Sequence, residues 1–306
     1  MRFGLSAFFA LSIGFTVPAF AQNDVPITIA PSTPWEVNFA EAKCRAARIF
    51  GEGDERTILF LEQIAPSTSP RWVMAGKVAD DLRSGGDLTV QFGPGVDAFQ
   101  MRASKGTTLG DFGRAFRSAS IRKPNKELKA RQPENESEDA EDRTEEVIGL
   151  PLLDVEEGKS IEWVEFRRGN RPPRRLATGN FGQLFELLNT CMSDLVRTWG
   201  IDVEAQKRRA RGPRPLNLSE IANRIQQYYP DRAERWGRQA DLSVRVMVDK
   251  TGAITECRIT NVSVAEDFDS RACEEFSQVG RFEPAVDTDG EPMDSFYVTS
   301  IQYRLY

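Results

Sequence analysis

Short runs of alternating apolar and polar residues dominate the first part of the chain. Such alternation is typical of β-strands with one buried face, and Gly, Pro and Ser turns separate the runs. Gly51-Glu-Gly53 and Ser84-Gly-Gly86 are the predicted hairpin connections. We therefore expect a mainly β domain over residues 22–203. Its predicted strands are Trp35–Phe39, Thr57–Glu62, Trp72–Val78, Asp87–Phe92, Ala98–Arg102 and Ile161–Phe166.

One stretch near the end of this domain has the period of a helix instead. Between Phe181 and Trp199 apolar residues recur at helical spacing, and Gly200 follows as a helix terminator. The pattern predicts an amphipathic helix whose buried face carries a cysteine. That face comprises Leu184, Leu187, Leu188, Cys191, Leu195 and Trp199.

Two segments have compositions unlike their surroundings. Residues 122–147 begin basic and polar and then become dense in Glu and Asp. Such a segment cannot bury enough apolar surface to offset its ordering entropy. We expect a disordered acidic insertion, with an acidic partner-binding loop as the alternative. Residues 204–217 are charged and broken by glycine and proline, which indicates an interdomain linker.

The last part of the chain, residues 218–306, alternates between helical and strand patterns. The predicted order is α-β-β-α-β, which with the first domain gives an α+β protein. A tight turn at Asp249–Gly252 connects the first two strands. Helices are expected over Ile221–Tyr229, Asp231–Trp236 and Phe268–Val279, and strands over Leu242–Val248, Ala253–Val262 and Phe296–Leu305.

The N-terminus has the features of a signal peptide. Arg2 is followed by a largely apolar stretch, and Ala19-Phe20-Ala21 gives the small-x-small cleavage pattern. We expect residues 1–21 to be removed after Ala21, which places the mature protein in the periplasm. The alternative is an uncleaved helix that anchors the chain in the inner membrane and faces the periplasm.

Composition removes several classes of function. The chain has 306 residues, a net charge of −6 and no histidine. Nucleophile systems that depend on histidine and metal sites that contain it are therefore excluded. The mild acidity gives no sign of nucleic-acid binding. The carboxylates Asp80 and Asp81 are adjacent, so on a strand they would point apart, and a solvated turn is the favoured interpretation. We expect no catalytic residues, cofactor or metal.

The four cysteines, Cys44, Cys191, Cys257 and Cys273, are an even number in an exported chain, which favours disulfides. No two of them form a C-x-x-C pair, so redox motifs and zinc ribbons are not indicated. Three pairings are open. Sequence proximity favours Cys257 with Cys273, which leaves Cys44 to pair with Cys191.

The C-terminal part resembles the C-terminal domain of the TonB energy-transducer family. The resemblance covers residues 218–306 and rests on a series of short motifs in the family's order. These are Tyr229-Pro230, Ala233, Val244-Arg-Val-Met-Val248, Asp249, Gly252, Arg281-Phe-Glu-Pro-Ala285 and Gly290. Many members also place one cysteine in the second strand and one in the following helix, as Cys257 and Cys273 would be.

The resemblance implies a docking function. In this family the domain binds short segments of outer-membrane receptors, which often add as a strand at the sheet edge. The last strand is the candidate edge, and Tyr297, Thr299, Ile301 and Tyr303 lie on one of its faces. The alternative is that this strand pairs within its own sheet or in a homodimer and offers no free edge.

A transducer of this family needs a membrane helix and a long Pro-rich spacer, and its anchor helix commonly carries a histidine. Here a compact domain stands where the spacer should be, and histidine is absent. We therefore expect an exported periplasmic interaction protein. The alternatives are an anchored energy transducer and a hydrolase in the β-rich first domain.

Overall fold

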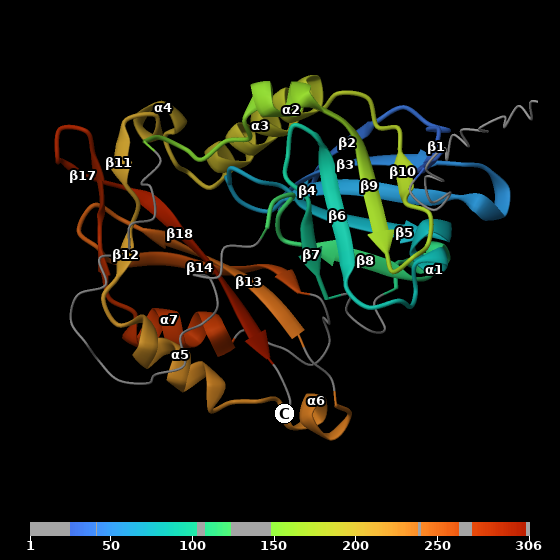
Figure 1. Cartoon of the computed structure of the whole chain (residues 1–306). Helices are drawn as coiled ribbons and strands as arrows, with labels where there is room; N and C mark the ends of the chain where they lie inside the picture. The colour runs from blue at the N-terminus through green and yellow to red at the C-terminus, as the bar shows by residue number, and fades with distance from the viewer. Residues whose placement is uncertain are drawn as a thin grey trace, which may run out of the picture.

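The computed structural model describes residues 25–40, 42–102, 108–123, 148–237, 240–262 and 271–303. The predicted signal peptide and nearly all of the predicted acidic insertion lie outside the described residues. The chain folds into a β-rich N-terminal domain and an α+β C-terminal module, which confirms the predicted fold class (Figure 1).

Two five-stranded sheets form the N-terminal domain. One sheet has the order β1 (Ile27–Ile29), β10 (Arg174–Leu176), β9 (Ile161–Arg168), β6 (Leu88–Pro94) and β7 (Phe99–Met101). The other has the order β2 (Glu36–Ala40), β3 (Lys43–Phe50), β4 (Thr57–Gln63), β5 (Arg71–Gly76) and β8 (Ala115–Ser118). Their inner faces share one apolar core, because alternate residues of each strand point inward.

Trp72 stands where the two sheets meet. It is fully buried, and its ring lies 5.9 Å from that of Phe92 and 5.7 Å from that of Phe166, both on the opposite sheet. Its indole N–H donates to the Ser120 carbonyl at 2.9 Å. The polar atom of this large side chain is thus satisfied inside the core.

Helix α3 (Gly182–Thr198) packs against β3 and β2 and closes one side of this core. Its apolar face contains the predicted Leu184, Leu188, Cys191 and Leu195, all buried. The prediction for Leu187 is wrong, since this side chain is 41% exposed at the margin of the helical face.

The strand predicted over Trp72–Val78 is shorter than expected. It ends at Gly76, and Lys77 begins α1 (Lys77–Asp81). Gly76 has φ +109°, and a Cβ there would lie 2.3 Å from the Arg56 carbonyl oxygen, so the change of direction requires glycine. Ser84–Gly86 consequently joins a helix to a strand of the other sheet and is not a hairpin turn.

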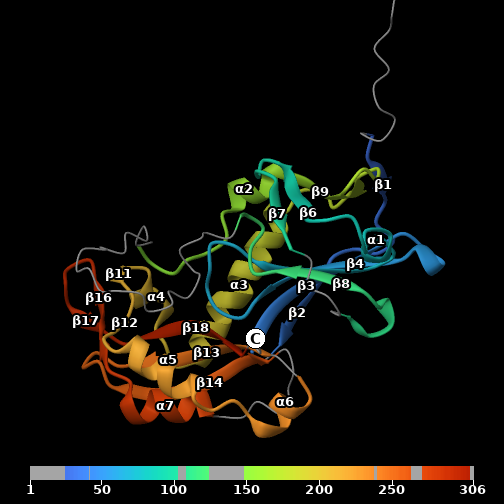
Figure 2. The same ribbon diagram turned by 60° about the horizontal axis from the view of Figure 1, so that its bottom comes forward.

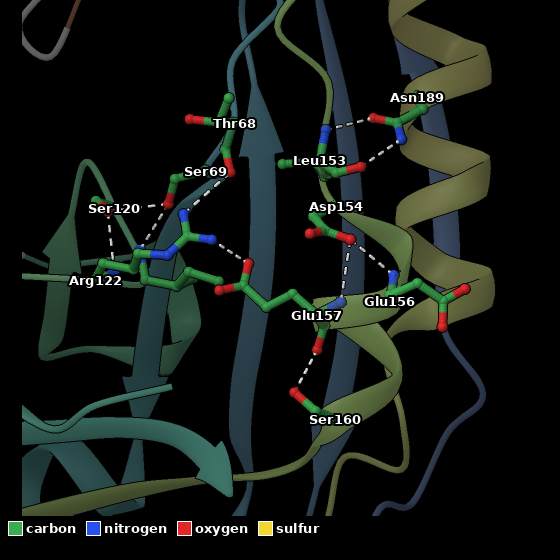
Figure 3. Close-up of polar contacts among 11 residues, drawn as sticks. Thr68, Ser69, Ser120, Arg122, Leu153, Asp154, Glu156, Glu157, Ser160 and Asn189 are labelled. Carbon is green, nitrogen blue, oxygen red and sulfur yellow. Dashed lines mark hydrogen bonds and ion pairs between the residues drawn. The ribbon is translucent and has the colours of Figure 1, made fainter. Parts of the chain in front are cut away.

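Polar contacts hold the chain on both sides of residues 124–147 (Figure 3). Arg122 pairs with Glu157 of α2 (Val155–Ser160) and donates to the Thr68 carbonyl at 3.3 Å. Leu153 exchanges two hydrogen bonds of 2.9 Å with the Asn189 side chain on α3. The two flanks of the segment are therefore fixed to the N-terminal domain.

The C-terminal module is a three-stranded sheet with helices on one face (Figure 2). The sheet order is β14-β13-β18, and α5 and α7 pack together beneath it. A second apolar core fills the space between helices and sheet. The elements are α5 (Leu218–Gln226), α6 (Asp231–Arg235), β13 (Ala240–Val248), β14 (Ile254–Val262), α7 (Arg271–Val279) and β18 (Ser295–Tyr303).

The segment predicted as a linker, residues 204–217, is not a spacer. It contains α4 (Val203–Gln206), β11 (Arg209–Arg211) and β12 (Arg214–Pro215). These strands pair with β16 (Ala285–Asp287) and β15 (Phe282–Glu283), and β17 (Pro292–Met293) extends the first pair. Gly212 and Pro213, which indicated a linker, separate the two short strands, and Pro215 lies within β12, so the segment belongs to the C-terminal module.

Candidate partner-binding edge

Strand β18 lies at an edge of the three-stranded sheet. It pairs with β13 without interruption, from Ser295 opposite Val248 to Tyr303 opposite Ala240. No strand pairs with its other side in the part of the chain that the structure describes. Among the described residues the strand thus pairs with β13 on one side and keeps its other edge unpaired, whereas the alternative expected no free edge.

The four residues predicted on this strand share one face, and that face packs on the core of the module. Tyr303 is buried and lies 5.6 Å, ring to ring, from Tyr229, while Tyr297 lies 5.3 Å from Phe282. Burial raises the pKa of Tyr297, although its hydrogen bond with Thr299 acts in the opposite direction. Thr299 and Ile301 are half-buried. These side chains anchor the strand, and the edge itself offers backbone groups.

The opposite face of β18 meets the N-terminal domain. We call this contact the domain junction. Trp199, at the end of α3, lies edge-on to Phe296 at 5.2 Å, an arrangement worth about 0.5–1.5 kcal/mol beyond burial. Farther along the strand, Ser300 and Gln302 are exposed on this face. The junction comprises Leu150, Val196, Trp199, Ile201, Val203, Met247, Phe296 and Val298.

A buried arginine completes the domain junction. Arg245 on β13 is only 4% exposed, and its guanidinium carbon lies 4.0 Å from the centre of the Trp199 ring. No sequence pattern had indicated a role for this residue. Both faces of β13 are buried in the structure, including the face that carries Ser243, Arg245 and Met247.

Two disulfides brace the two parts of the chain separately. Cys44 is bonded to Cys191, which ties β3 to α3, and Cys257 is bonded to Cys273, which ties β14 to α7. These are the pairings that sequence proximity favours. Neither bridge crosses the domain junction.

The carboxylates considered for catalysis make structural ion pairs. Asp81 lies 2.8 Å from Lys77 and 3.1 Å from Arg174, and Asp80 lies 3.6 Å from Arg114. Within the described ranges, no three His, Cys, Asp or Glu side chains are grouped so that they could hold a metal ion.

Comparison with known protein families identifies the C-terminal part of the chain. Residues 225–305 match the family model described as Gram-negative bacterial TonB protein C-terminal. The C-terminal module is a TonB C-terminal domain. The match spans β13, β14, α7 and β18, and it leaves the N-terminal domain outside. No curated protein matches the sequence. Within the described residues, no helix of the chain combines the length and the apolar character needed to span a membrane.

The TonB C-terminal domain of this chain has both faces of its sheet covered. The helices α5 and α7 cover one face, and the end of α3 together with α4 covers the first half of β18 on the other. Access to the unpaired edge is therefore greatest along the second half of the strand, from Thr299 to Tyr303.

Proposed function

We propose that the chain is an exported periplasmic interaction protein that binds an extended segment of a partner protein along β18. The partner segment adds as a fourth strand, so that backbone hydrogen bonds supply affinity and alternate side chains supply selectivity. The observation that carries the proposal is the unpaired edge of β18 in a TonB C-terminal domain. In this proposal the chain acts by binding, without catalysis.

The second half of β18 is the proposed docking region. Exposed Ser300 and Gln302 would lie beside the added strand, while half-buried Tyr297 and buried Tyr303 hold β18 in place. A receptor of the outer membrane or another envelope protein is the expected source of the segment. The pair of disulfides fits an oxidising compartment such as the periplasm.

Photocrosslinking tests the edge directly. A benzoylphenylalanine at Gln302 of β18 should crosslink the partner in intact cells. The same group at exposed Thr255, on the opposite edge strand β14, is the matched control. After purification of the partner, hydrogen exchange should slow in residues 295–303 when the complex forms. Slowing confined to β14 or to the N-terminal domain would refute strand addition at β18.

The anchored energy transducer is the competing proposal. It requires the N-terminal apolar segment to persist, whereas the periplasmic protein requires its removal after Ala21. Mass spectrometry of the purified protein separates the two. A mature chain that begins near Gln22 and is free in the periplasm would rule out the transducer.

A further inference from the structure

The N-terminal domain has an unpaired strand edge of its own. Strand β2 (Glu36–Ala40) lies at the edge of its sheet and pairs with β3 over all five residues without a register shift. Among the residues that the structure describes, no strand pairs with its other side. In Figure 1 this edge is at the top, and β8 forms the opposite edge of the same sheet.

The β2 edge carries an exposed aromatic ring. Phe39 is 57% exposed, although it lies on the same face of β2 as Val37, which packs on the core. That face is the one that α3 covers, because Phe39 pairs with Cys44, whose side chain is bonded to Cys191 of α3. The apolar core therefore ends at Phe39 and leaves much of its ring uncovered.

Helix α3 places a second apolar side chain beside this edge. Phe185 and Asn189 lie on the margin of α3 that faces α2 and the residues before it. At about 100° per residue, Leu187 lies on the other side of Cys191, toward β2, and it is 41% exposed. Phe39 and Leu187 thus border the unpaired edge on the same face of the sheet.

The sequence of β2 is complementary to itself. In an antiparallel pair of two copies centred on Asn38, Val37 lies opposite Phe39 of the second copy, and Glu36 lies opposite Ala40. All five residues are then paired, apolar side chains meet on the α3 side, and no two like charges are opposite. A shift by one residue would place apolar side chains opposite polar ones, and a shift by two would leave residues unpaired.

We propose that the chain forms a two-fold symmetric dimer in which β2 of each copy pairs with β2 of the other. The two five-stranded sheets join into one, and Phe39 and Leu187 of both copies become buried beside the two α3 helices. Strand β2 has no proline, lysine or bulge, the features that keep a strand edge from pairing. Self-complementarity favours a second copy over a foreign segment.

The dimer uses a different edge from the one proposed for partner binding. Strand β2 belongs to the N-terminal domain and β18 to the TonB C-terminal domain. Each copy in the dimer therefore keeps its β18 edge, and dimer formation does not depend on strand addition there. A dimer would present two docking edges to its partners.

Introduced cysteines test both the pairing and its register. All native cysteines are in disulfides, so Asn38→Cys supplies the one free thiol. Directly opposite residues have Cα atoms about 4.5–5.5 Å apart, within the range of disulfides, so mild oxidation should link the chains as a dimer. Glu36→Cys, on the same face of the same strand, is the matched control. In the dimer it lies about 14 Å along the strand from its own counterpart and should stay unlinked.

Sedimentation equilibrium measures the association itself. The chain from Gln22 onward contains every helix and strand that the structure describes and is used without the apolar segment before it. Phe39→Ser should raise the dissociation constant about 100-fold, about tenfold for each of the two rings that lose burial. Leu216→Ser removes an apolar side chain of similar exposure, 59%, from the C-terminal module and should leave the dissociation constant unchanged.

Four results would overturn the proposal. These are a monomer at every protein concentration, equal linking of Asn38→Cys and Glu36→Cys, a dimer that Phe39→Ser does not weaken, and a dimer that Gln302→Cys links through β18 instead. The last result would also show that the edge proposed for partner binding is occupied by a second copy. Failure of the β2 dimer alone would leave the proposed function untouched.

Discussion

Replacing Cys44 and Cys191 together with alanine should destabilise the protein more than the same replacement of Cys257 and Cys273. A disulfide stabilises the folded state mainly by restricting the unfolded chain, and the effect grows with the length of the closed loop. The first bridge spans 147 residues and the second only 16. Alanine is the suitable substitute for the first pair because both cysteines lie in the apolar core.

The loop lengths set the expected magnitudes. The chain-entropy relation gives about 5 kcal/mol for the long loop and about 3 kcal/mol for the short one. The free energy of unfolding of a whole domain is about 5–15 kcal/mol, so loss of the Cys44–Cys191 bridge brings the N-terminal domain close to unfolding even without denaturant. Loss of the Cys257–Cys273 bridge should leave the N-terminal domain unaffected, because both cysteines lie in the C-terminal module.

Urea unfolding followed by tryptophan fluorescence measures the difference. Buried Trp72 reports on the N-terminal domain, and far-ultraviolet circular dichroism reports on the whole chain. The midpoint of the fluorescence transition should fall for the Cys44/Cys191 variant and stay unchanged for the Cys257/Cys273 variant. Equal losses in the two variants, or a larger loss for Cys257/Cys273, would refute the reasoning from loop length.

Two further predictions concern the TonB C-terminal domain. Glu275 of α7 is fully buried and forms ion pairs with Arg224 of α5 and with Arg271. Glu275→Gln should therefore lower the free energy of unfolding, measured by urea titration, by about 1–3 kcal/mol. An unchanged free energy of unfolding would contradict a structural role for Glu275. Hydrogen bonds from the Thr251 side chain and from backbone N–H groups lower the pKa of Asp249, so its ionised form stabilises the turn between β13 and β14. That stabilisation is present above the pKa of an unfolded aspartate and is lost as the pH falls through the lower folded value. The melting temperature of Asp249→Asn should therefore lie below that of wild type at neutral pH, and the two should converge in acid. A difference in melting temperature that widens in acid would count against this account.

The sequence by itself determined the local elements of this protein. Alternation along Leu242–Val248 predicted β13, and helical spacing from Phe181 to Trp199 predicted α3, because both patterns record which side of an element is buried. The order of motifs from Tyr229 to Gly290 was enough to indicate a TonB C-terminal domain. Spacing along the chain was also enough to favour the two disulfide pairings that the structure contains.

Only the tertiary structure decided what these elements pack against. Gly212 and Pro213 indicated a linker, yet the residues around them pair with β15 and β16, which lie some seventy residues later in the chain. Strand pairing of this kind depends on backbone groups that every residue has, so composition does not reveal it. The second face of β13 and β18 could equally have faced solvent. It is covered because α3 ends beside it, and that contact brings Trp199 to Arg245.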